Sequence, residues 1–174
     1  MKRKILVAID MQNDFIDGSL GTKEAKQIVQ KAIDKIKSYD SKDIYATRDT
    51  HFENYLETNE GRNLPVMHCI KGSKGWEIRH EIMALLSNAV IIDKPIFGSF
   101  ELADMLYDIS KIDEIEIELI GLCTDICVVA NAILLKTKMP EINISIDSSC
   151  CAGTTPEMHR AAIDTMKMCQ INVI

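Results

Sequence analysis

The chain has 174 residues, 47% of them hydrophobic and 26% charged, a balance typical of a soluble globular protein. Its 20 Lys and Arg residues against 26 Asp and Glu residues give a net charge of −6, which argues against a surface that binds nucleic-acid phosphates. No apolar stretch approaches the roughly 20 residues of a membrane span, so we expect one domain over residues 1–174 that acts on a small molecule, not on nucleic acid or a membrane.

The N-terminus and the cysteines predict a cytoplasmic location. The basic residues 1–4 lead into an apolar run that Asp10 interrupts after five residues, too short for the hydrophobic region of a secretion signal. Without such a signal, the six cysteines are expected to be free thiols. Cys123 and Cys127 are four residues apart, which is not the CxxC spacing of a redox or zinc motif.

Apolar runs alternate with amphipathic stretches along the chain. The predicted strands are residues 4–9, 43–47, 89–93, 116–121, 143–147 and 171–174. The predicted helices are residues 23–38, 75–86, 100–109, 125–138 and 156–168. This alternation predicts a three-layer α/β/α sandwich around a mostly parallel, six-stranded, Rossmann-like sheet. Residues 49–74 show no clear period and are predicted to form a long loop, which at this length is usually functional or mobile.

Chemically active side chains follow the predicted strands. Asp10 follows the first strand, Asp49 and His51 follow the second, Lys94 the third and Cys127 the fourth. Because ligands of open parallel sheets bind at the carboxyl ends of the strands, we expect these side chains on one rim.

Cys127 is the strongest candidate for a reactive group on this rim. It falls in the first turn of a predicted helix, where free backbone N–H groups and the helix dipole favour a thiolate. A nearby lysine would lower the pKa of the thiol and a carboxylate could accept its proton, and Lys94 and Asp10 are the candidates. Taken singly, each has an ordinary alternative: a buried small residue, a solvated lysine and a turn cap.

Four motifs together resemble the nicotinamidase/isochorismatase-like cysteine hydrolases over essentially the whole chain. They are residues 10–15 (DMQNDF), residues 49–51 (DTH), Lys94 and residues 121–128 (GLCTDICV), in the order found in that family. The resemblance implies the isochorismatase-like hydrolase fold and a catalytic triad of Asp10, Lys94 and Cys127. In the implied mechanism, the Cys127 thiolate attacks an amide carbonyl, ammonia leaves, and water hydrolyses the thioester.

The same resemblance implies how the substrate is held. The oxyanion would bind the backbone N–H groups of Cys123 and Cys127, after a cis peptide between Leu122 and Cys123. Aromatic side chains typically sandwich a nicotinamide ring, and Phe15 and Phe97 are the candidates. The aromatic residue often found before the last metal-binding histidine is absent here, and Trp76 is a displaced substitute.

A metal site is implied beside the triad. Nicotinamidases bind a divalent ion through an aspartate and histidines, with a glutamate replacing one histidine in some members. Here the ligands would be Asp49, His51, His68 and Glu60, with Glu57 as the alternative to Glu60. Such a set suits zinc, manganese or iron. Alternatively, Asp49 and His51 cap the loop and His68 is a hydrogen-bonded core residue.

Three functions remain open from the sequence. Isochorismatases cleave a vinyl ether without a thiol nucleophile, so Cys127 favours C–N hydrolysis, with nicotinamide as the leading substrate. The second hypothesis is the same catalytic core acting on another small amide, ureide or carbamoyl compound. The third is a metal-binding or thiol redox-sensing protein without hydrolytic activity. We expect a homodimer or homotetramer, as in relatives, and surface positions without a role for His80 and His159.

Overall fold

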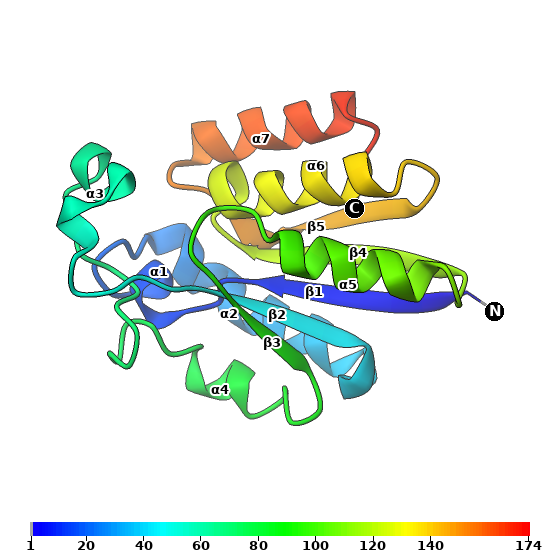
Figure 1. Ribbon diagram of the computed structural model, residues 1–174, viewed down its shortest axis with the longest axis horizontal. Helices are drawn as coiled ribbons and strands as arrows, with labels where there is room; N and C mark the ends of the chain where they lie inside the picture. The colour runs from blue at the N-terminus through cyan, green and yellow to red at the C-terminus, as the bar shows by residue number, and fades with distance from the viewer. Residues whose placement is uncertain (1) are drawn as a thin grey trace.

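A six-stranded parallel sheet forms the centre of the computed structural model, which describes residues 2–174 (Figure 1). The strands are β1 (Arg3–Ile9), β2 (Ile44–Asp49), β3 (Val90–Lys94), β4 (Ile115–Leu122), β5 (Asn143–Ala152) and β6 (Asn172–Val173). They lie in the order β3-β2-β1-β4-β5-β6, and every neighbouring pair is parallel. The predicted α/β fold is therefore confirmed.

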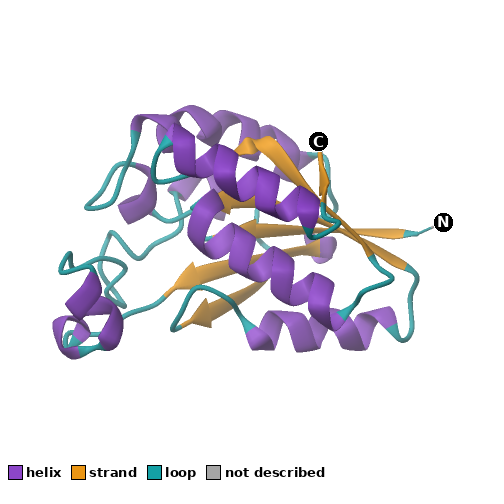
Figure 2. Cartoon of the chain, turned by 90° about the horizontal axis from the view of Figure 1, so that it is seen from above, coloured by secondary structure: helices purple, strands orange, loops and turns teal. Residues whose placement is uncertain are grey.

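Helices cover both faces of the sheet, as the view from above shows (Figure 2). They are α1 (Asn13–Ile16), α2 (Lys23–Lys37), α3 (Asn59–Asn63), α4 (His80–Met83), α5 (Phe100–Ser110), α6 (Val129–Lys138) and α7 (Pro156–Met168). Side chains of β1 alternate between two buried clusters, because successive residues of a strand point to opposite faces. Ile5, Val7 and Ile9 pack with α5, α6 and α7. Leu6 and Ala8 pack with α1, α2 and α4.

One predicted helix is wrong. Residues 75–86 were expected to be helical, but only the four residues of α4 are. The backbone before α4 pairs instead with the segment after β1: the Asn13 N–H donates to the Glu77 carbonyl, and Gln12 forms an antiparallel bridge with Ile78. Gly75 lies so close to Asp14 that an added Cβ would be 2.1 Å from the carboxylate. These tertiary contacts override the helical pattern of the sequence.

Two further segments differ from prediction. The predicted loop 49–74 contains a short 3-10 turn, η2 (Tyr55–Glu57), and then α3, which Thr58 caps by accepting from the Gly61 N–H at 3.0 Å. Strand β5 continues five residues past its predicted end at Asp147, because its last residues pair with the end of β4.

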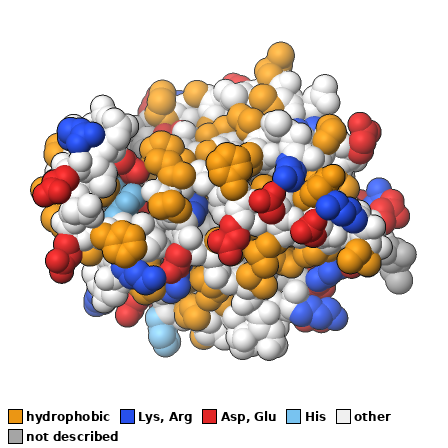
Figure 3. All heavy atoms as spheres, viewed as in Figure 1, with side chains coloured by type: hydrophobic (Ala, Val, Ile, Leu, Met, Phe, Trp, Pro, Cys, Tyr) orange, Lys and Arg blue, Asp and Glu red, His pale blue; other side chains and the backbone are white. Residues whose placement is uncertain are grey.

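The position of β1 fixes where a ligand can bind. It lies between β2 and β4: the chain runs from β1 to β2 and β3 on one side and then returns from β3 to β4 on the other, which opens a crevice at the carboxyl end of β1. On the face drawn in Figure 3, acidic and basic side chains are interspersed among hydrophobic ones. None of the helices within residues 2–174 combines the length and apolar character that crossing a membrane requires.

Candidate active site

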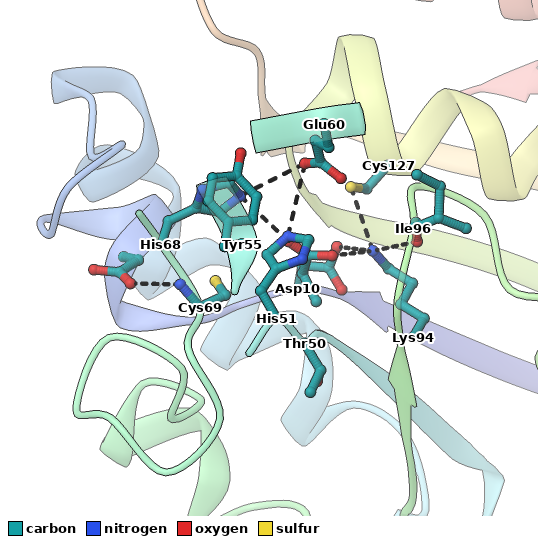
Figure 4. Close-up of polar contacts among 12 residues, drawn as sticks. Asp10, Thr50, His51, Tyr55, Glu60, His68, Cys69, Lys94, Ile96 and Cys127 are labelled. Atoms are coloured by element: carbon teal, nitrogen blue, oxygen red, sulfur yellow. Dashed lines mark hydrogen bonds and ion pairs between the residues drawn. The ribbon is translucent and has the colours of Figure 1, made fainter. Parts of the chain in front are cut away.

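Asp10, Lys94 and Cys127 meet at the carboxyl end of the sheet (Figure 4). Asp10 follows β1, Lys94 ends β3, and Cys127 lies in a π-helical turn, η3 (Thr124–Val128), between β4 and α6. The Lys94 Nζ atom is 2.7 Å from Asp10 Oδ2 and 3.4 Å from Cys127 Sγ. The exposed fractions of Asp10, Lys94 and Cys127 are 0%, 1% and 4%, so all three side chains are buried.

Neighbouring groups hold this cluster in place. The Thr47 hydroxyl donates to Asp10 Oδ1 at 2.6 Å, and the Lys94 ammonium donates to the Ile96 carbonyl at 3.2 Å. Asp10 has a φ of 47°, in the left-handed region, and its N–H donates to the Thr47 carbonyl. The sequence did not reveal the Thr47 and Ile96 contacts, because they depend on strand register and on the course of a loop.

Burial dominates the proton affinities of the thiol and the carboxyl group. It raises the pKa of Cys127 well above the ordinary value, and the charge of Asp10 adds to this while Lys94 opposes it. Burial also raises the pKa of Asp10, against the attraction of Lys94. Burial alone would lower the pKa of Lys94, but Asp10 and Cys127 outweigh it and raise that pKa. Lys94 acts on the Cys127 pKa in the expected direction, but burial and Asp10 outweigh it, so the thiol needs a base to become a nucleophile.

Four possible metal ligands converge beside this cluster. One ligand atom each from Asp49, His51, Glu60 and His68 lies within 4.8 Å of all the others. Asp49 Oδ2 is 2.9 Å from His51 Nε2 and 3.5 Å from His68 Nε2. Within residues 2–174, the buried Nε2 atom of His51 has no aligned hydrogen-bond partner. Two imidazoles, two carboxylates and an unpartnered nitrogen fit a divalent ion such as zinc.

Glu60, rather than Glu57, lies in this group. The Glu60 Oε1 atom is 3.7 Å from His51 Nε2 and 3.8 Å from His68 Nε2, whereas Glu57 is exposed. Figure 4 shows Glu60 reaching down from α3 toward the two imidazole rings. The capped turn of α3 places this carboxylate, which spacing in the sequence alone left ambiguous.

Two residues without a predicted role orient the possible ligands. The Tyr55 ring packs 4.7 Å from the His51 ring and 5.0 Å from the His68 ring, centre to centre. The Gln12 side chain accepts from the Asp49 N–H at 2.7 Å and donates to the Asp49 carbonyl at 2.8 Å. Such contacts fix the direction of metal-ligating groups. Gln12 belongs to the DMQNDF motif, which is the signal that could have found it.

A cavity of about 840 Å³ opens above the thiol. Phe15 and Phe97 line it, together with Cys123 and Cys127, as expected for substrate-binding residues. The peptide between Leu122 and Cys123 is cis, as the resemblance implied. The Cys123 carbonyl accepts from two N–H groups of η3, both at 3.1 Å, which fixes the turn that carries the thiol.

Two expectations outside the cavity are wrong. Trp76 does not replace the missing aromatic residue of the wall: its ring stacks on Arg48 at 3.9 Å and its Nε1–H donates to Thr50 at 2.8 Å. His80 is exposed as expected, but His159 is half-buried and its Nδ1 atom is 2.8 Å from the Thr124 hydroxyl. The cause is the packing of α7 against η3, which amphipathic patterning does not reveal.

Comparisons with known proteins show the family of this chain. The family model of the isochorismatase domain matches residues 4–174. The nicotinamidase of Saccharomyces cerevisiae is 24% identical, with 98% of this chain and 99% of the yeast protein aligned. The pyrazinamidase of Pyrococcus horikoshii, solved in complex with zinc, is 28% identical over 98% of each chain, with a TM-score of 0.83. Nicotinamidase PncA of Bacillus subtilis is 26% identical over 99% of each chain, with a TM-score of 0.82.

The fold, the rim of functional groups and these relatives define the class: the protein is an amidohydrolase. It belongs to the isochorismatase family, because the family model covers nearly all of the chain. The family and the enzyme class expected from the sequence are thereby confirmed.

Proposed function

We propose that the enzyme hydrolyses the C–N bond of a small, uncharged amide through a thioester on Cys127, with nicotinamide, converted to nicotinate and ammonia, as the leading substrate. The observation that carries the proposal is the meeting of a buried thiol, an ammonium group and a carboxylate under a cavity of about 840 Å³. The similarity to proteins named nicotinamidase supports the substrate.

Asp10 begins the reaction as the general base. Its carboxylate lies 2.7 Å from the Lys94 ammonium, which is itself 3.4 Å from the Cys127 thiol, and burial has increased the affinity of Asp10 for a proton. Lys94 contacts both groups, so its charge stabilises the thiolate while the proton moves to the carboxylate. The thiolate then attacks the amide carbon.

The backbone at η3 stabilises the charge that develops on the carbonyl oxygen. The N–H groups of Cys123 and Cys127 are the proposed donors, since both residues line the cavity. Protonated Asp10 returns its proton to the departing ammonia. Water then attacks the thioester carbonyl, with Asp10 again as base, and releases the carboxylic acid and the free thiol.

Asp49, His51, Glu60 and His68 are the proposed ligands of a divalent cation, for which zinc, manganese and iron are the candidates. When bound, the cation supplies positive charge and a coordination position for a donor atom of the substrate, such as a ring nitrogen. The zinc in the Pyrococcus horikoshii relative supports zinc as the first metal to test.

The charges around the cavity favour a neutral substrate. Among residues 2–174, the side chains that line the cavity include no lysine or arginine, and they include the carboxylates of Asp49 and Glu60. A carboxylate on the substrate would therefore meet no protein cation in the wall. Phe15 and Phe97 offer aromatic surface for a flat ring. Other neutral amides, ureides and carbamoyl compounds are the alternative substrates.

A cytoplasmic, reducing compartment suits this chemistry, because all six cysteines are free thiols. A purely redox-sensing or metal-binding role does not fit an amidohydrolase.

Ammonia release from nicotinamide tests the proposal, with Cys127→Ala measured beside the wild type. The control is Cys150→Ala, which removes another buried thiol outside the cavity wall. We expect turnover by the wild type and by the control, and none by Cys127→Ala. Full turnover by Cys127→Ala would refute the thioester. Turnover only of another neutral amide would correct the substrate and retain the mechanism.

A further inference from the structure

Asn131 is a fully buried polar residue on an otherwise apolar face of α6. Its exposed fraction is 0%, and its buried neighbours on this helix include Ala132 and Leu135. A carboxamide without partners in such surroundings destabilises the fold, so its hydrogen bonds show what keeps it there.

Both ends of the Asn131 carboxamide are engaged. The Nδ2 atom donates to the Cys127 carbonyl at 2.8 Å and to the Phe97 carbonyl at 3.0 Å. The Oδ1 atom accepts from the Ser99 N–H at 2.9 Å. Both N–H donors of the amide are thus used, and its oxygen has one partner. The Asn131 side chain therefore links the turn that carries Cys127 to the loop that contains Phe97 and Ser99.

That loop directly follows Lys94, the ammonium group of the catalytic cluster. Residues 95–99 connect Lys94, at the end of β3, to α5. Within the loop, the Ile96 carbonyl accepts from the Lys94 ammonium at 3.2 Å, and Phe97 lines the cavity. Asn131 therefore contacts the backbone of the thiol residue and the backbone of the segment that holds the ammonium group.

We propose that Asn131 is a positioning residue for the amidase reaction, which fixes the Cys127 turn and the 95–99 loop in one relative position. This inference rests on the proposed function. Asn131 touches no reacting atom, and it acts by preserving the 3.4 Å contact between Cys127 Sγ and Lys94 Nζ and the place of Phe97 in the cavity wall. Since displacements of about 1 Å cost on the order of 100-fold in rate, a tie of this kind affects catalysis directly.

Two variants break the link between the Cys127 turn and the 95–99 loop in different ways. Asn131→Leu fills a similar volume and removes all three hydrogen bonds. Asn131→Ser keeps a hydroxyl that can donate to the Cys127 carbonyl four residues earlier, as serine does in helices, but it is too short to bridge to the loop. The control is Thr137→Val, which removes a side-chain hydrogen bond to the Ile133 carbonyl in the same helix.

Two readouts distinguish positioning from folding. The first is the rate of Cys127 alkylation by iodoacetamide at pH 7.5, located by fragmentation mass spectrometry because Cys123 also lines the cavity. This measurement needs no substrate, so it remains decisive if nicotinamide is not turned over. The second is kcat and KM for nicotinamide. Both the alkylation rate and the kinetic constants are measured well below the melting temperature of each variant.

For both Asn131 variants we expect alkylation to slow by about tenfold, because the thiolate loses its fixed cationic neighbour, and kcat to fall by about 100-fold. KM should rise only a few-fold through Phe97. Thr137→Val should match the wild type in both readouts. Alkylation and kcat within twofold of the wild type in either variant would overturn the proposal, and so would an equal loss in Thr137→Val. If Asn131→Leu fails to fold, Asn131→Ser decides.

Discussion

Lys94→Met is the substitution for which the structure predicts the clearest combined effect on stability and activity. Methionine has a similar length but no charge, and Lys94 is only 1% exposed. The change leaves Asp10 with a hydrogen bond from Thr47 and no cation. The thiol of Cys127 loses its positive neighbour at the same time.

The magnitude follows from the separation of the charges. At 2.7 Å and an effective permittivity of about 20, the attraction between Lys94 and Asp10 is about 6 kcal/mol. Desolvation of the two ions offsets much of it, and removing one partner of a buried pair costs about 3–5 kcal/mol. Asp10 can then bind a proton, because burial and Asp49 already raise its pKa. We therefore expect the free energy of unfolding at pH 7 to fall by about 3 kcal/mol, and amide hydrolysis by at least about 1,000-fold.

Urea denaturation measures the first quantity, and EDTA in all samples keeps metal content equal. The control is Lys71→Met, because Lys71 is 52% exposed and 3.6 Å from Asp93, and a change below about 0.5 kcal/mol is expected there. The double variant Asp10→Asn/Lys94→Met should recover more than half of the lost stability without recovering activity. A loss under 1 kcal/mol in Lys94→Met, or a double variant less stable than the single one, would refute the reasoning.

Three further predictions concern the metal site, a histidine and a glycine. Glu60→Gln should weaken zinc binding on the order of 100-fold in a competition titration with a chelating dye, whereas Glu57→Gln should leave it unchanged; equal effects would remove Glu60 from the ligand set. Burial lowers the pKa of His159, so the unfolded chain binds its proton more readily, and stability should fall as pH drops below about 6.5. Urea denaturation at pH 7.5, 6.5 and 5.5 should show a smaller fall in His159→Gln, and parallel curves would contradict the assignment. Gly121→Ala should be severely destabilised in thermal unfolding, because φ is +126° and the new Cβ would lie 2.0 Å from a carbonyl oxygen of β1. In Gly72→Ala, by contrast, the added methyl meets no atom of residues 2–174 within 4 Å, and only the cost of a positive φ, about 1 kcal/mol, is expected.

The succession of strands, and the ends of β1 to β4 to within two residues, were predictable from the sequence. Apolar runs of strand length mark β1 to β4, and the rule that ligands bind at the carboxyl ends of parallel strands placed Asp10, Lys94 and Cys127 among the candidates. The family resemblance then implied that these three form the triad. The structure brings these three side chains together, and their catalytic roles remain predictions to be tested by mutation.

What could not be predicted depends on contacts between distant segments. Asn131 reads in the sequence as an ordinary helical residue, and only the packing of the 95–99 loop on α6 gives its carboxamide partners. Most of the helix expected at residues 75–86 does not form, because the backbone there pairs with Gln12 and Asn13 instead. The raised pKa of Cys127 reflects burial, which local sequence does not report.

Because Glu60 lies on α3, a metal bound there would also affect the conformational dynamics of this helix. The five-residue helix α3 is too short to be stable by itself, and it projects from the body of the molecule (Figure 1). A cation shared between Glu60 and Asp49 would cross-link this outlying segment to β2, so the free energy of binding would also be free energy of local ordering. Amide hydrogen exchange in α3 should therefore slow as zinc is added, while exchange in the central strands stays the same. The concentration of metal in the cell would then set the fraction of protein molecules in which α3 is ordered beside the cavity.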